Sequence, residues 1–182
     1  VCNEFSYGTV KQNIIDGLSR RQFLWSKIAF IVGVSLMTSL VAMTIGLIMG
    51  FLWSPVKGLP FIMKNIEFIP AYFLQLVGFQ LFCLIIALLI KRSGFVLALL
   101  IFYVFVIEPI ISGIISYQYD RPELADLLPV NAIGAVIPLP FTKYALMETQ
   151  DYVGFGDVAV CLIYIFVFAG LSFYLITKRD LA

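Results

Sequence analysis

The sequence predicts an all-α, polytopic membrane protein that crosses a bilayer four times. Of its 182 residues, 62% are hydrophobic and 13% are charged, whereas a soluble domain is about half apolar and about a quarter charged. Four stretches are as apolar and as long as the roughly 20 residues that a helix needs to cross the hydrocarbon core. Because an isolated strand in lipid has unpaired backbone groups, we expect these stretches to be helices.

The four predicted spans belong to one transmembrane domain, residues 28–182. They cover about residues 28–53, 71–90, 94–117 and 158–176. The first span contains no charged residue, and the third is interrupted by Glu108 and Pro109. The sequence begins at Val1 without a methionine or a signal-peptide pattern. We therefore expect the chain to be truncated at its N-terminus, with an earlier part of the protein missing.

An amphipathic cytosolic segment, residues 1–27, precedes the first span. Thr9 and Gln12 fit a capping box, which predicts a helix from Val10, and Gly17 can end that helix. Apolar side chains recur through the segment at near-helical spacing: Phe5, Tyr7, Val10, Ile14 and Leu18.

A second capping box, Ser19 with Gln22, predicts that a new helix begins at Arg20 and runs into the first span. We therefore expect a short amphipathic helix, a sharp turn and then a long helix that enters the membrane. The short helix has two interpretations: it docks on a partner protein, or it lies on the lipid surface.

Basic residues indicate the side of the membrane on which each loop lies, because cytosolic loops are enriched in Lys and Arg. With the N-terminal segment in the cytosol, the cytosolic side holds Lys11, Arg20, Arg21, Lys27, Lys91, Arg92, Lys178 and Arg179. The outer side then holds Lys57, Lys64, Arg121 and Lys143. This excess predicts a multi-pass protein of the cytoplasmic (cell) membrane, with both ends of the segment in the cytosol.

The long outer connection, residues 118–157, contains an apolar piece at residues 129–141. This piece is too short to span a membrane and is broken by Pro138 and Pro140. Such a run is typical of a re-entrant or interfacial segment before the last helix. The alternative is an ordinary outer loop with a small hydrophobic cluster.

Glu108 is the only ionisable residue well inside a predicted span. Ionisable side chains are costly in lipid and are functional candidates by default, so Glu108 can line a translocation path or hold a kink at Pro109. Alternatively, the third span ends near Ile107 and leaves Glu108 at the interface. Gln75 and Gln80 of the second span are further candidates for the path, or they hydrogen-bond to neighbouring helices.

Small residues line one face of the first span at i+3 and i+4 spacing: Ser35, Ser39, Ala42, Gly46 and Gly50. Small side chains let membrane helices approach one another closely. We expect this stripe to pack against a neighbouring helix of the same chain or against a second subunit.

Several functions are excluded by residue types that the chain lacks. It has no histidine, which excludes Ser-His-Asp catalysis and histidine metal sites within it. Its cysteines have no metal-ligand spacing, and no basic run supports nucleic-acid binding. No second acidic residue or nucleophile constellation accompanies Glu108 in the spans, so an intramembrane enzyme is disfavoured.

No GxxxxGK[ST] loop is present, so we expect no ATP or other cofactor to bind this chain.

The N-terminal segment contains a Glu-x-x-x-Gly-Thr element, then a Ser-Arg pair and a lysine before the first span. These positions are Glu4, Gly8, Thr9, Ser19, Arg20 and Lys27. The pattern resembles the cytosolic segment of permease subunits of type-2 ABC exporters. Members of that family have six spans and re-entrant helical elements before the last one, so the resemblance implies that this chain supplies spans three to six.

The resemblance also implies a coupling helix that docks on a separate ATP-binding-cassette ATPase subunit, which would bind the ATP. Its contact residues would be Glu4, Tyr7, Gly8, Thr9, Val10, Ile14, Leu18 and Arg20. The chain itself would be a transport subunit without an ATPase site, and a second permease copy or a paralogue would complete the path through the bilayer. The alternative function is a membrane scaffold or assembly protein without a transport cycle.

Overall fold

The computed structural model describes residues 17, 19–53, 63, 66–90, 92–137 and 152–178. The predicted amphipathic helix that begins at Val10, and residues 138–141 of the predicted re-entrant piece, lie outside these ranges. Every regular element within the described ranges is a helix. The predicted all-α class is therefore confirmed for this part of the chain.

The described helices follow one another in a simple order. They are α3 (Arg20–Trp53), α5 (Phe68–Ile90), α6 (Ser93–Phe102), the π-helix η1 (Tyr103–Ile107), α7 (Glu108–Gln118), α8 (Pro122–Asp126), α9 (Pro129–Ala135) and α11 (Phe155–Lys178). α6, η1 and α7 run on without a break, so Ser93–Gln118 is one long helix. This helix, α3, α5 and α11 are long and apolar enough to cross a membrane. They are the four apolar helices that the sequence predicts, as expected of a membrane-embedded protein.

The start of α3 is fixed by the predicted capping box. The Ser19 hydroxyl accepts a hydrogen bond from the Gln22 backbone N–H (3.2 Å), and Gln22 Oε1 accepts one from the Ser19 backbone N–H (2.9 Å). These bonds satisfy donors that the first turn of a helix leaves unpaired. Gly17 has a φ of 100°, a left-handed conformation that glycine adopts readily. The chain therefore turns at Gly17 before α3 begins.

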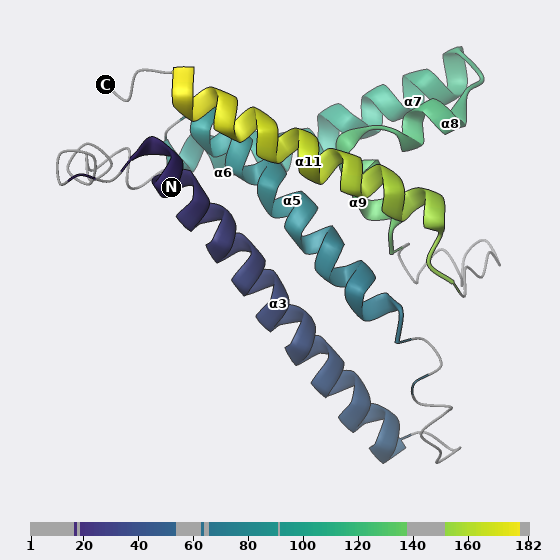
Figure 1. Ribbon diagram of the computed structural model, residues 1–182. Coiled ribbons are helices and arrows are strands. Elements are labelled where there is room, and N and C mark those ends of the chain that lie inside the picture. The colour runs from purple at the N-terminus through teal and green to yellow at the C-terminus, as the bar shows by residue number, and fades with distance from the viewer. Residues whose placement is uncertain are drawn as a thin grey trace.

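One end of the bundle gathers helix ends from distant parts of the sequence (Figure 1). The N-terminus of α3, the C-terminus of α5, the N-terminus of α6 and the C-terminus of α11 lie there, and the helices diverge towards the other end. The Arg20 guanidinium donates a hydrogen bond to the Thr177 carbonyl (3.4 Å), and the Trp25 and Phe173 rings meet edge to face at 5.4 Å. These contacts join the first and last long helices.

The gathered end is also the basic end of the described structure. Its basic side chains are Arg20, Arg21, Lys27, Arg92 and Lys178. In α11, Asp157 lies in the first turn and Lys178 in the last, an order that the helix dipole favours. The prediction that this end faces the cytosol rests on these residues.

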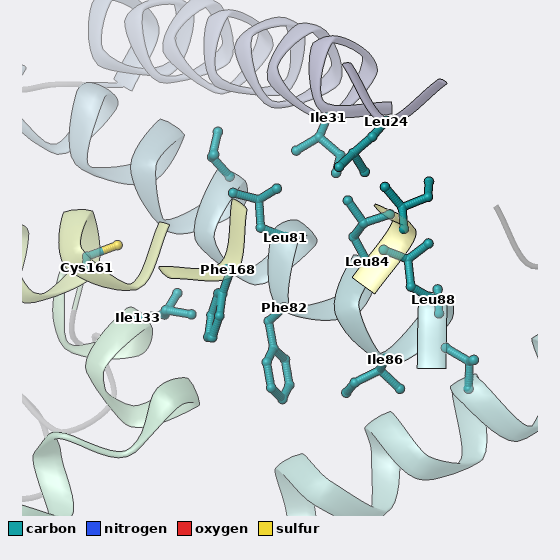
Figure 2. Packing of buried hydrophobic residues seen from close by; sticks show 14 of the residues in the cluster. Leu24, Ile31, Leu81, Phe82, Leu84, Ile86, Leu88, Ile133, Cys161 and Phe168 are labelled. Carbon is teal, nitrogen blue, oxygen red and sulfur yellow. The ribbon is translucent and has the colours of Figure 1, made fainter. Parts of the chain in front are cut away.

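The hydrophobic core lies where α3, α5 and α11 meet. Leu24 and Ile31 of α3 lie opposite Leu84 of α5 (Figure 2). Towards α11, the Phe82 and Phe168 rings pack with their centroids 5.6 Å apart. α5 is thus the central helix, because it contacts α3, α6, α9 and α11.

The second half of α3 is less buried than the first half. The buried residues of this helix end at Ser39. Exposed apolar side chains follow, among them Val41, Ile45, Ile48 and Leu52. Such a surface suits lipid or another apolar helix.

Gly78 allows three helices to approach closely inside the core. A Cβ at this position would lie 3.4 Å from Ile133 Cγ1 of α9 and 3.5 Å from Cys161 Sγ of α11. Both neighbours are buried (Figure 2), so a large side chain at this position has no free space. Gly170 of α11, by contrast, has nothing within 4 Å of the corresponding point.

Replacing Gly78 with leucine is expected to force α9 away from α5 and α11. Overpacking a filled core costs roughly 1–3 kcal/mol, so Gly78→Leu should lower the unfolding temperature in detergent, as followed by size-exclusion chromatography after heating. Gly170→Leu is the matched control and should leave that temperature unchanged. An equal decrease in both variants would contradict the close approach at Gly78.

Candidate functional site

Glu108 lies inside the described bundle, with 1% of its surface exposed. The helix that contains it continues to Gln118, so the third apolar helix does not end near Ile107. Both interpretations of Glu108, within the membrane or at its edge, stay predictions. A carboxyl group in such surroundings needs hydrogen-bond partners, because burying it unpaired is costly.

A π-helical turn, η1, immediately precedes Glu108. The Glu108 backbone N–H donates to the Tyr103 carbonyl, five residues back. Pro109 follows, and a proline ring has no N–H and crowds the carbonyl four residues before it. The wider π-turn gives this ring room and rotates the residues that follow it relative to those before it. Single π-turns within α-helices are frequent at functional sites.

The partner of the Glu108 carboxylate is the N-terminal turn of α9. Oε1 accepts a hydrogen bond from the Asn131 backbone N–H at 2.6 Å. Pro129, the first residue of α9, has no N–H, and the Ala132 N–H donates to the Leu128 carbonyl (2.7 Å). Asn131 therefore carries a donor that α9 cannot satisfy by itself, and a negative charge at a helix N-terminus is favourable. Glu108 thus caps α9 from another helix.

Two further hydrogen bonds hold the segment that contains α9. The Asn131 side chain donates to a carbonyl of α8 at 3.1 Å, and the Tyr164 hydroxyl of α11 donates to the Leu127 carbonyl. Tyr103 of η1 and Tyr164 of α11 lie near the Glu108 carboxyl group. Side chains of the third and fourth apolar helices therefore converge on α8 and α9.

The second carboxylate oxygen of Glu108 is buried and has no hydrogen-bond partner among the described residues. The polar cluster of Glu108, Tyr103, Asn131 and Tyr164 is therefore an acceptor site with spare capacity in apolar surroundings. Such an oxygen can accept a hydrogen bond from water or from an ammonium or hydroxyl group. Within the described ranges, no group of Cys, Asp and Glu side chains is placed to hold a metal ion.

The chain between Glu108 and Asn131 leaves the bundle and returns to it. α7 leads away from Glu108, and α8 packs back against α7 (Figure 1). α9 then packs against α5 and α11, with Ala132, Ile133 and Val136 buried. The described part of the apolar piece, residues 129–137, is therefore packed against the core, and its entry into the membrane stays a prediction.

A second buried polar contact links α5 to α3. Gln80 Nε2 donates to Ser35 Oγ at 2.9 Å, and the Ser39 hydroxyl donates to the Ser35 carbonyl at 2.7 Å. Gln80 is thus an interhelical hydrogen-bond donor, one of the two roles expected for it. Gln75, the other candidate on α5, is half-buried.

The small-residue stripe of α3 divides into two halves. Ser35 and Ser39 are buried, and α3 packs there against α5. Ala42 and Gly50 are half-buried, whereas Gly46 has nothing within 4 Å of the place where a Cβ would lie. The first half therefore packs within the chain, and Gly46 faces open space.

Most of the predicted coupling residues lie outside the described part of the chain: Glu4, Tyr7, Gly8, Thr9, Val10, Ile14 and Leu18. Arg20, the last of the set, is the first residue of α3 and contacts Thr177. The end of the predicted coupling segment is therefore beside the C-terminal turn of α11.

Sequence reasoning misses Asn131, Tyr103 and Tyr164. Asn131 is the one strongly polar residue between Pro129 and Pro138, and a lone amide in an apolar piece is a signal for a buried partner. The tyrosines give no such signal, because tyrosine is common at membrane interfaces for its amphipathic ring.

Comparison with known proteins relates the whole chain to one family model. That model, described as "Protein of unknown function (DUF2705)", matches residues 1–182. No curated protein and no solved structure matches the chain. The function therefore has to be inferred from the residues and their arrangement.

Two substitutions of Glu108 test separately whether its hydrogen-bond acceptor or its charge holds α9. Glu108→Gln keeps an acceptor for the Asn131 N–H, and Glu108→Leu removes it. A buried donor without a partner costs about 1–3 kcal/mol. The backbone amides of residues 129–137 should therefore exchange hydrogen for deuterium faster in the leucine variant than in the parent. In the glutamine variant their exchange rates should be close to those of the parent. Equal exchange in both variants would show that packing alone holds α9.

Proposed function

We propose that the chain, which belongs to the DUF2705 family, is the membrane-spanning permease subunit of an ATP-binding-cassette exporter. A separate subunit binds and hydrolyses ATP, and this chain transmits the resulting movement to a translocation path. The observation that carries the proposal is the element that resembles the cytosolic segment of type-2 ABC exporter permeases: Glu4, Gly8, Thr9, Ser19, Arg20 and Lys27.

The junction between this element and α3 supports mechanical coupling. Gly17 turns the chain, and the Ser19–Gln22 capping box begins α3 at Arg20. α3 then continues to Trp53 as one helix of 34 residues. In the proposal, a displacement of the coupling segment passes through the turn at Gly17 and is carried along this helix.

Contacts near the start of α3 extend this movement to the last long helix. Arg20 hydrogen-bonds to the Thr177 carbonyl, and Trp25 packs on Phe173. In the proposal, these contacts make α3 and α11 respond together when the ATPase subunit moves the coupling segment.

The arrangement before the last long helix also supports the proposal. Type-2 exporters have re-entrant helical elements at this point, and here α8 and α9 return to Glu108. In the proposal, residues 129–137 re-enter the membrane from its outer side, and Glu108 holds them at that depth. Glu108, with Gln75 and Gln80 of α5, belongs to the polar groups near the translocation path.

A second copy of the chain, or a paralogue, completes the path. The surface proposed to receive it is the second half of α3, after Ser39, where Gly46 and Gly50 allow a close helix approach. The same surface favours the second candidate function, a membrane scaffold without a transport cycle, because an apolar helix face can assemble with other helices without an ATPase.

Co-purification distinguishes the two functions. Affinity purification of the full-length protein from its native membrane, in a detergent that preserves such complexes, is expected to recover an ATP-binding-cassette ATPase subunit in stoichiometric amount. Absence of any ATPase from this preparation would contradict the permease proposal and support the scaffold function.

A matched pair of charge substitutions tests the coupling face. Val10→Glu places a charge on the apolar face of the predicted helix and should lower ATPase recovery about tenfold or more, because an unpaired charge is costly in an apolar groove. Gln12→Glu adds the same charge to the polar face and should leave ATPase recovery and membrane insertion unchanged. Undiminished recovery with Val10→Glu, or an equal loss in both variants, would contradict docking through this face.

A further inference from the structure

A groove lies between α3, α5 and α6, close to the basic end of the bundle. Its volume is about 520 Å³, within the range of roughly 300–1,000 Å³ that is typical of small-molecule sites. Ser26, Lys27 and Phe30 line it from α3, Ala87 lines it from α5 and Val96 lines it from α6. All three helices are thus needed to form it.

Among the described residues that line it, the groove combines an apolar wall with one cationic side chain. The Lys27 ammonium lies over the Phe23 ring, 5.0 Å from the ring centroid. Gln80 also lines the groove, and its Nε2 donates to Ser35. Lys27 is therefore the charged group that a ligand in this groove would meet.

The length of α3 places Lys27 near the level of lipid headgroups. A helix of 34 residues is about 51 Å long, whereas the hydrocarbon core is about 30 Å thick. The end that projects from the core on this side begins with Arg20 and Arg21, and lysines near helix ends extend towards the interface. The groove thus runs from the headgroup region into the hydrocarbon region.

We infer that the groove binds an anionic phospholipid of the leaflet at the basic end. One acyl chain lies against the apolar wall formed by Phe30, Ala87 and Val96, and the phosphate pairs with the Lys27 ammonium. Charge complementarity selects this occupant, because Arg20, Arg21, Lys27, Arg92 and Lys178 are at the same end of the bundle and basic residues near a membrane surface attract anionic lipids. The site does not depend on the proposed transport function.

Tryptophan fluorescence in vesicles tests this site in the full chain. Phe30, which lines the groove, is replaced by tryptophan, and Trp25 and Trp53, the two tryptophans of the sequence, are replaced by phenylalanine. Brominated phosphatidylglycerol or brominated phosphatidylcholine is then added at equal mole fractions to phosphatidylcholine vesicles. We expect phosphatidylglycerol to bind about fivefold more tightly, the factor that corresponds to about 1 kcal/mol for one basic residue near the membrane surface.

Two lysines of the same end provide a matched comparison. Lys178 also lies over an aromatic ring, that of Tyr174 at 4.8 Å, but it is on α11 and does not line the groove. Lys27→Gln should abolish the fivefold preference, and Lys178→Gln should preserve it. No preference in the parent protein, or an equal loss in both lysine variants, would overturn the inference and leave only ordinary annular lipid.

A second variant tests the position of the acyl chain without changing the charge. Ala87→Leu places a larger side chain in the groove. The ratio of the affinity for phosphatidylglycerol to that for phosphatidylcholine should therefore fall towards one. This variant also tests the inference if circular dichroism shows that Lys27→Gln fails to fold. An unchanged preference in a folded Ala87→Leu protein would overturn the assignment of the acyl chain to this groove.

Discussion

Burial of the Glu108 carboxyl group among apolar helices requires the chain to bring a hydrogen-bond donor to it. That donor is the Asn131 N–H in the first turn of α9, which has no partner within that helix. The bond solves two problems together, because an unpaired carboxylate and an unpaired helix N-terminus are both costly in apolar surroundings. The return of α8 and the burial of α9 bring Asn131 to Glu108, and Gly78 leaves room for Ile133 of α9 in the core.

The basic end of the bundle is held together by a helix cap and by contacts between α3 and α11. Capping by Ser19 and Gln22 begins α3 at a defined residue, and the contact of Arg20 with Thr177 joins α3 to α11. The long helices therefore converge at the basic end and diverge elsewhere (Figure 1). If the proposed permease function holds, force from an ATPase subunit enters at this convergence, while Glu108 and α9 respond at a distance from it.

Local patterns in the sequence were sufficient for the helices and insufficient for the site. The apolar helices and the Ser19–Gln22 cap are set by neighbouring residues, so hydropathy and spacing predict them. Glu108 and Asn131 are 23 residues apart, and Gln80 and Ser35 are 45 residues apart. Such pairs depend on how helices pack, and no periodicity encodes them. The same applies to the small-residue stripe, of which only Ser35 and Ser39 are buried within the chain.

Single cysteines are introduced into a chain whose own Cys2, Cys83 and Cys161 are replaced by alanine. Their labelling with a membrane-impermeant maleimide, added from the outer side, tests the role of Glu108 most directly. Leu124→Cys on α8, where the native side chain is 49% exposed, should react readily, and Ala132→Cys on α9, where it is 2% exposed, should be protected. If Glu108 holds α9 in place, Ala132→Cys becomes reactive in combination with Glu108→Leu and stays protected with Glu108→Gln. Ready labelling of Ala132→Cys in the parent chain, or protection that survives Glu108→Leu, would contradict this account.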